Sequence, residues 1–146
     1  MKESMYRGAA LALIASEEKP HQFLLSKRRA VESQTTHQRW QLPGGAIEKG
    51  ELPEEAVARE LEEELNLKEV SLNYLGETNI VNHDLNDNVT PLYLFLCFYS
   101  INNDLPELLD NGASELRWFS AEEASAADLL FATRKAIELF IDHVDQ

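Results

Sequence analysis

Apolar residues near the N-terminus form two short runs with a polar turn between them. Residues 6–15 are mostly small or apolar, residues 17–20 read Glu-Glu-Lys-Pro, and residues 22–26 resume with Phe23, Leu24 and Leu25. Short apolar runs bounded by turn residues are typical of strands. The pattern therefore predicts a strand, a turn and a second strand.

The second half of the chain contains three more segments with strand character. Residues 70–81 alternate in part between polar and apolar, which predicts a half-exposed strand, whereas residues 90–101 are almost continuously apolar and predict a buried central strand. The polar residues 82–88 between them predict a loop. Residues 115–119 predict a further short strand.

Helix signals occur at three places. Residues 43–45, Pro-Gly-Gly, predict a sharp break, after which Pro53 suits the first turn of a helix that Asn66 ends. Residues 120–123 form a capping-box pattern that predicts a short helix. Residues 133–144 predict an amphipathic helix whose apolar side could cover a core or serve a homodimer interface.

Alternation of strands and helices predicts an α/β domain in which a mixed sheet is covered on both faces. The length of 146 residues suits one domain over residues 1–146 and allows an adequate core. The apolar run at residues 9–15 is too short to span a bilayer, so we expect no membrane association. Cys97, the single cysteine, lies in an apolar run, and a reducing, cytoplasmic setting is the default expectation.

The formal net charge of −13 argues against a nucleic-acid polymer as partner. Such a chain cannot replace the counterions of a phosphate backbone over an extended surface. A small phosphorylated ligand remains compatible, because metal ions and a few cationic side chains can neutralise it locally.

Three glutamates share one face of the helix that starts near Pro53. At about 100° per residue, Glu64 lies about 40° to one side of Glu60 and Glu63 about 60° to the other. Like charges so close repel one another, which predicts a cation at this face. Oxygen ligands without a nearby His or Cys favour Mg²⁺ or Mn²⁺ over zinc. The alternative, a merely solvated acidic face, is common for charge runs.

The wider spacing favours a site over a solvated face. Gly45 and Glu51 precede the helix, and the helix carries Arg59-Glu60 followed by Glu63-Glu64, in the order G-x5-E-x7-R-E-x-x-E-E. This order, with the Trp-x-Leu-Pro-Gly-Gly lead-in at residues 40–45, resembles the signature box of the Nudix hydrolases. Asn66 stands where the family usually has Gly, and Asn tolerates the left-handed conformation that a helix end requires.

The resemblance implies a Nudix-like α/β/α sandwich with a mixed sheet, and metal ligation by Glu60, Glu63 and Glu64. A backbone carbonyl of Gly44 or Gly45 could complete the metal shell. The resemblance also implies that Glu51 and Arg59 fasten the loop to the helix, and by helical geometry Arg59 points about 100° away from Glu60. Their loss should harm catalysis because the ligands would be misplaced.

The implied activity is Mg²⁺-dependent hydrolysis of the diphosphate linkage in a nucleoside diphosphate derivative. Conversion of a nucleoside triphosphate into monophosphate and pyrophosphate is the leading hypothesis, and cleavage of ADP-ribose or a nucleotide sugar is the alternative. A catalytically silent nucleotide sensor and a prenyl diphosphate isomerase are hypotheses of other classes. Intact glutamates argue against the sensor, and the buried setting predicted for Cys97 argues against the isomerase.

The sequence pattern constrains the residues that bind substrate or accept a proton less than it constrains the metal ligands. Lys27, Arg28 and Arg29 could contact phosphate or form a solvated strand end, and Trp40 could stack on a base or belong to the core. The general base is either a glutamate of the box or an acid outside it. The outside candidates are Asp84, Asp87 and Glu115, with His83 as a weaker one.

Overall fold

Seven strands form one mixed sheet in the computed structural model, which describes residues 7–19, 21–29, 39–82, 88–109 and 112–144. The path through the sheet runs β3-β2-β1-β6-β5, with β4 paired to β1 and β7 paired to β2. The strands are β1 Ala9–Ser16, β2 Gln22–Arg28, β3 Trp40–Gln41, β4 Gly44–Ala46, β5 Asn73–Asn82, β6 Asn88–Tyr99 and β7 Ala113–Ser120.

The strands β1 and β6 form the parallel centre of this sheet, with Ala9 opposite Leu92 and Ser16 opposite Tyr99. The other described pairs are antiparallel, including β5 with β6 and β7 with β2. Central strands that are covered on both faces are apolar over most of their length. This explains the near-continuous apolar run that predicted β6, and that prediction is confirmed.

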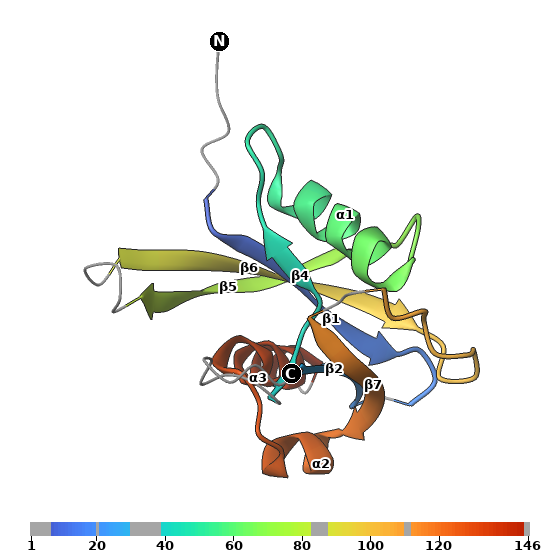
Figure 1. Cartoon of the computed structure of the whole chain (residues 1–146). Coiled ribbons are helices and arrows are strands. Elements are labelled where there is room, and N and C mark those ends of the chain that lie inside the picture. The colour runs from blue at the N-terminus through green and yellow to red at the C-terminus, as the bar shows by residue number, and fades with distance from the viewer. Residues whose placement is uncertain (1–6, 20, 30–38, 83–87, 110–111, 145–146) are drawn as a thin grey trace.

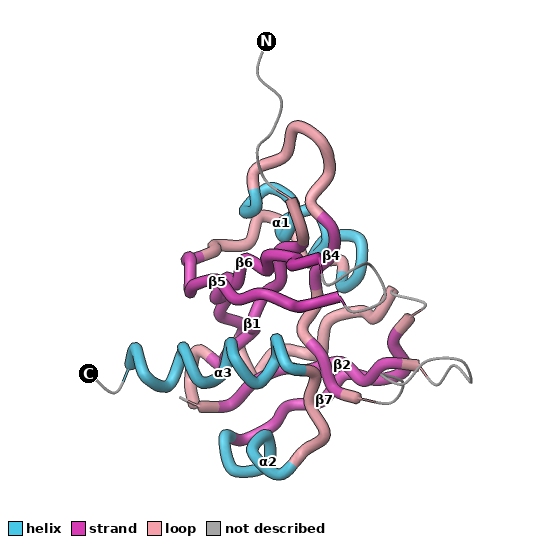
Figure 2. The backbone as a smooth tube through the Cα atoms, turned by 90° about the vertical axis from the view of Figure 1, so that its left-hand side faces the viewer, coloured by secondary structure: helices cyan, strands magenta, loops and turns pink. Residues whose placement is uncertain are grey.

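Helices cover both faces of the sheet (Figures 1 and 2). The helix α1 (Pro53–Leu65) packs on one face through Ala56, Val57, Leu61 and Leu65. The helices α2 (Ala121–Ala126) and α3 (Phe131–Val144) cover the other face. The predicted α/β/α arrangement is therefore confirmed.

Local capping explains where the helices begin and end. The Glu55 carboxylate accepts a hydrogen bond from the backbone N–H of Leu52 at 2.8 Å, and Pro53 follows in the first turn. Asn66 ends α1 in the left-handed conformation, with φ of 55°, as the sequence predicted. Ser120 and Glu123 form the predicted reciprocal capping box at α2.

One local prediction is wrong. The Pro-Gly-Gly sequence predicts a sharp break that begins a loop; the chain does bend at Pro43, but Gly44–Ala46 then forms the strand β4, paired antiparallel with β1. The close approach of the two backbones explains why glycine is needed. A Cβ atom on Gly44 would lie 2.2 Å from the carbonyl oxygen of Ala10.

The helices of the described residues were compared with the length and apolar character that a bilayer requires, and none of them meets both conditions.

Candidate functional site

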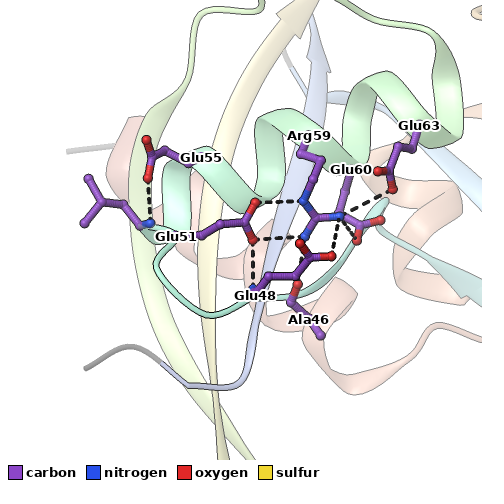
Figure 3. Close-up of polar contacts among 8 residues, drawn as sticks. Ala46, Glu48, Glu51, Glu55, Arg59, Glu60 and Glu63 are labelled. Carbon is purple, nitrogen blue, oxygen red and sulfur yellow. Dashed lines mark hydrogen bonds and ion pairs between the residues drawn. The ribbon is translucent and has the colours of Figure 1, made fainter. Parts of the chain in front are cut away.

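The loop between β4 and α1 is tied to the helix by one arginine (Figure 3). Arg59 donates from Nε and Nη2 to the two carboxylate oxygens of Glu51, at 2.7 and 3.0 Å. Its Nη2 also donates to the carbonyl oxygen of Ala46 at 3.1 Å, and Glu51 accepts from the backbone N–H of Glu48 at 2.8 Å. The expected pairing of Glu51 with Arg59 is confirmed.

The side chains of Arg59 and Glu51 are only 24% and 19% exposed. Solvent therefore screens the attraction between them less than it would at the open surface. The hydrogen bonds from Arg59 are the largest cause of a lowered pKa of the Glu51 carboxyl. Reciprocally, the Glu51 carboxylate is the main cause of a raised pKa of Arg59. A two-bond fork between a guanidinium and a carboxylate also fixes orientation, so this pair sets the path of the loop.

The same guanidinium reaches the acidic face of α1. Its Nη1 lies 3.0 Å from Glu60 and 3.4 Å from Glu63, measured to carboxylate oxygens. The expectation that Arg59 points away from Glu60 is thus wrong for the head group, because the long side chain bends back along the helix. Glu60 and Glu63 share one cationic nitrogen, and Glu62 is exposed, as Glu63 is.

The two glycines of β4 lie beside two glutamates of α1, Gly44 beside Glu64 and Gly45 beside Glu60. Glu64 accepts a hydrogen bond from the backbone N–H of Gly44 at 2.9 Å. A Cβ atom on Gly45 would lie 2.6 Å from a carboxylate oxygen of Glu60. The Glu60 carboxylate therefore occupies the space that a side chain at position 45 would fill, and both glycines place backbone atoms beside the acids.

The donor set suits a hard divalent ion, although the side chains are not gathered around one point. Among the described residues, no group of three or more His, Cys, Asp or Glu side chains is arranged to hold a metal. Two carboxylates converge on the guanidinium nitrogen of Arg59, which shows that a cation can be shared there. Binding of one ion by Glu60, Glu63 and Glu64 would need these carboxylates to converge on it, alongside or in place of their contacts with Arg59 and Gly44.

A cavity of about 650 Å³ lies beside β4 on the α3 side of the sheet. Gly44 lines this cavity while its N–H binds Glu64, so one residue joins the cavity to the acidic face. The apolar lining includes Leu11, Leu42, Leu92, Leu130 and Phe131. The polar lining includes Arg28, Arg39, Gln41 and Asn79.

One cation at the cavity, Arg28, is among those that the sequence offered, and the other, Arg39, is not. Arg28 lines it and donates to Gln41 at 3.0 Å, and Arg39 lines it while pairing with Asp128 at 3.3 Å. Arg28 is one of three adjacent basic residues, of which Arg29 lies beyond the end of β2, and the pairing of β2 with β7 is irregular between Lys27 and Arg28. Arg39 gave no signal in the sequence, because its position depends on the pairing of β3 with β2.

The other predicted substrate contacts, Lys27, Arg29 and Trp40, do not line this cavity. The Lys27 ammonium sits 5.9 Å from the ring centre of Trp40, and Arg29 donates to the carbonyl oxygen of Ala113 at 3.2 Å. Trp40 is 8% exposed, and its ring packs edge-on against Phe119 at 4.7 Å. These placements fit the core and strand-end alternatives, and a role in substrate binding stays a prediction.

Of the outside candidates for the general base, three lie beyond the described residues, namely His83, Asp84 and Asp87. Glu115 is exposed on β7, where it stands opposite Lys27 of β2 in the strand register. The choice between a base within the box and one outside it stays open.

Comparison with known proteins decides the family. The model of the NUDIX domain matches residues 5–140. The chain belongs to the NUDIX domain family. The resemblance drawn from the spacing of the glycines, glutamates and arginine is thereby confirmed.

Individual relatives agree with this assignment. An RNA pyrophosphohydrolase of a Nitratiruptor species is 34% identical over 74 residues, which cover 49% of this chain and 44% of the relative. The matched part thus spans less than half of that relative.

Solved structures cover more of the chain. The MutT NUDIX hydrolase from Burkholderia pseudomallei superposes with a TM-score of 0.69 at 27% identity, covering 91% of this chain and 96% of that one. The NUDIX domain of Shewanella oneidensis NrtR, complexed with ADP ribose, has a TM-score of 0.73 at 18% identity, covering 93% and 86%. The second likeness shows the shared Nudix fold alone.

Proposed function

We propose that this Nudix domain is a pyrophosphohydrolase that cleaves the diphosphate linkage of a nucleoside diphosphate derivative, with nucleoside triphosphates as its main substrates and monophosphate and pyrophosphate as products. The position of Gly44 carries the proposal. This residue lines the cavity and contacts Glu64. A nucleoside in the cavity would therefore direct its phosphates past β4 toward the carboxylates of α1.

Members of this family generally use divalent metals such as Mg²⁺, and we propose Mg²⁺ or Mn²⁺ here. Glu60, Glu63 and Glu64 would hold the ion, with a carbonyl of Gly45 as a further oxygen. When bound, such an ion neutralises phosphate charge and favours ionisation of the attacking water. One of the glutamates or an acid outside the helix would accept the proton of that water.

The remaining residues position the reacting groups. The Glu51–Arg59 fork holds the loop against α1, and small errors in the placement of catalytic groups are costly. Arg28 and Arg39 would offset the charge of the phosphates at the cavity. In a chain with a net charge of −13, such local cations matter for the approach of an anionic ligand.

A second candidate substrate is the 5′-triphosphate end of an RNA, which the match to the Nitratiruptor enzyme favours. Such an end presents the same phosphoanhydride bond as a free nucleotide. The strongly acidic chain argues for short contacts with the end rather than with an extended backbone. ADP-ribose and nucleotide sugars are further candidates, and a binding-only sensor is the non-enzymatic one.

An assay of product release separates these functions, with pyrophosphate measured for the triphosphates and nucleoside monophosphate for ADP-ribose and the nucleotide sugars. The panel holds nucleoside triphosphates, a triphosphorylated RNA oligonucleotide, ADP-ribose and nucleotide sugars, each with Mg²⁺ and with a chelator. We expect Mg²⁺-dependent release of pyrophosphate, fastest with a free triphosphate. Faster turnover of the RNA oligonucleotide would make the triphosphate end of an RNA, rather than a free nucleoside triphosphate, the main substrate. Saturable binding without turnover of any compound would contradict the enzymatic proposal.

A further inference from the structure

A second cavity, of about 360 Å³, lies next to the start of α1. We call it the aromatic groove, and its lining is Leu52, Pro53, Glu54, Tyr74, Tyr93 and Phe95. Phe95 and Tyr93 belong to the core that packs under α1, so the groove is on the other face of the sheet from the larger cavity. The proposed nucleotide path therefore does not use it.

The register of β5 and β6 assembles the rings. Tyr74 stands directly opposite Phe95, and their ring centres are 5.5 Å apart at an interplanar angle of 69°. Phe95 is 6% exposed and Tyr74 is 59% exposed. The buried Phe95 ring thus forms the base of the groove, and the exposed Tyr74 ring at its side is accessible to a ligand.

The charge at the aromatic groove is negative. Glu54 lines the groove. Glu77 stands opposite Tyr93 in the pairing of β5 with β6, so the Glu77 and Tyr93 side chains project to the same face of the sheet. No Lys, Arg or His is among the described residues that line the groove. Burial and then the charge of Glu77 raise the pKa of the Tyr74 hydroxyl, which agrees with a negative local potential. A phosphate-bearing ligand is disfavoured there.

We propose that the aromatic groove binds the alkylated ammonium group of a small organic cation. The faces of aromatic rings attract cations, and a nearby carboxylate adds Coulombic attraction. Alkylation suits the apolar walls of Leu52 and Pro53, because methyl groups replace N–H groups that would otherwise lose hydrogen bonds to water. The overall charge of −13 further favours a cationic ligand.

The test is an NMR titration of the full chain with choline as the probe. A matched probe is the neutral isostere in which a tert-butyl group replaces the trimethylammonium group. We expect saturable shifts of Tyr74 and Tyr93 resonances with choline, and at least about tenfold weaker binding of the isostere. Equal binding of both probes, or no saturation below about 10 mM choline, would overturn the proposal. Tighter binding of Nα-acetyl-lysine amide, which keeps the lysine ammonium group, than of choline would also overturn the proposal. The ligand of the groove would then be a protein side chain.

Three variants test whether choline binds in the aromatic groove. Tyr74→Leu removes an exposed ring with little expected effect on folding, and should weaken choline binding about tenfold. Glu54→Gln should weaken it a few-fold and reduce its salt dependence. Phe98→Leu is the matched control, since Phe98 is 46% exposed on the same strand as Phe95 but does not line the groove. Equal losses in the Tyr74 and Phe98 variants, with circular dichroism unchanged, would refute the assignment to this groove.

Discussion

The two sides of β4 are built in different ways. On the α1 side, Glu60, Glu63 and Glu64 come from two turns of one helix, and their spacing alone places them together. On the cavity side, Arg28 and Arg39 come from separate segments that meet only when β3 pairs with β2. The acids are therefore evident in the sequence, whereas the cations depend on strand pairing.

The largest expected effect tests the acidic side. Glu63→Gln should reduce turnover by a factor on the order of 10² or more, because the amide loses the charge that holds a cation near the phosphates. Steady-state kinetics with Mg²⁺ measures this loss. Glu62→Gln is the matched control, since Glu62 is the exposed neighbour on the same helix. Unchanged turnover in Glu63→Gln would remove this residue from the site.

The adjacent glycines should respond differently to the same substitution. In Gly44→Ala, the new Cβ would meet the Ala10 oxygen and Leu11 Cα at 2.2 and 2.7 Å, at a φ of +141°. We expect a loss of about 2–4 kcal/mol in the free energy of unfolding, measured by urea denaturation.

In Gly45→Ala, the new Cβ would meet the end of the flexible Glu60 side chain, at 2.6 Å. That carboxylate can turn aside with little effect on stability, but then leaves its place in the site. We expect turnover to fall about tenfold to a hundredfold with unfolding nearly unchanged. If Gly45→Ala loses stability as Gly44→Ala does, the contrast between the two glycines is contradicted.

A smaller effect separates the cavity cations from the strand-end lysine. Arg28→Gln should raise KM for the triphosphate about three- to tenfold with kcat nearly unchanged, because it removes one charge beside the bound phosphates. Lys27→Gln is the control, because that ammonium lies over Trp40. A larger effect in Lys27→Gln would reverse the assignment and make Lys27 the phosphate contact.

The smallest effect concerns acid stability. Arg59 lowers the pKa of Glu51 below its ordinary 4.5, so this pair stabilises the fold above about pH 4.5 and loses that stabilisation as the pH falls through the lowered value. In Arg59→Met, the unfolding free energy should be lower at neutral pH and should fall less on acidification. Arg39→Met is the control, since Arg39 and Asp128 are 42% and 72% exposed. If the free energy of unfolding of Arg59→Met fell on acidification as steeply as that of the unaltered chain, the link between Arg59 and the pKa of Glu51 would be contradicted.

Several local features were predictable because their causes are local. Asn66 ends α1, Ser120 caps α2, and the glutamates share a helix face through spacing of three and four residues. The Nudix fold and family followed from the same short-range pattern. The strand β4 was missed because its pairing with β1 is a contact between distant segments, which the Pro-Gly-Gly sequence does not reveal.

The order of residues along the chain is enough to specify the family, the two helical layers and which carboxylates stand together, since helix geometry converts spacing directly into position. Three other relations emerge only from the folded chain: Arg59 bends back to Glu60 and Glu63, Arg28 rather than Lys27 lines the cavity, and Gly44 joins cavity to acids. These relations depend on side-chain reach and on the pairing of strands far apart in the chain, which no local spacing encodes.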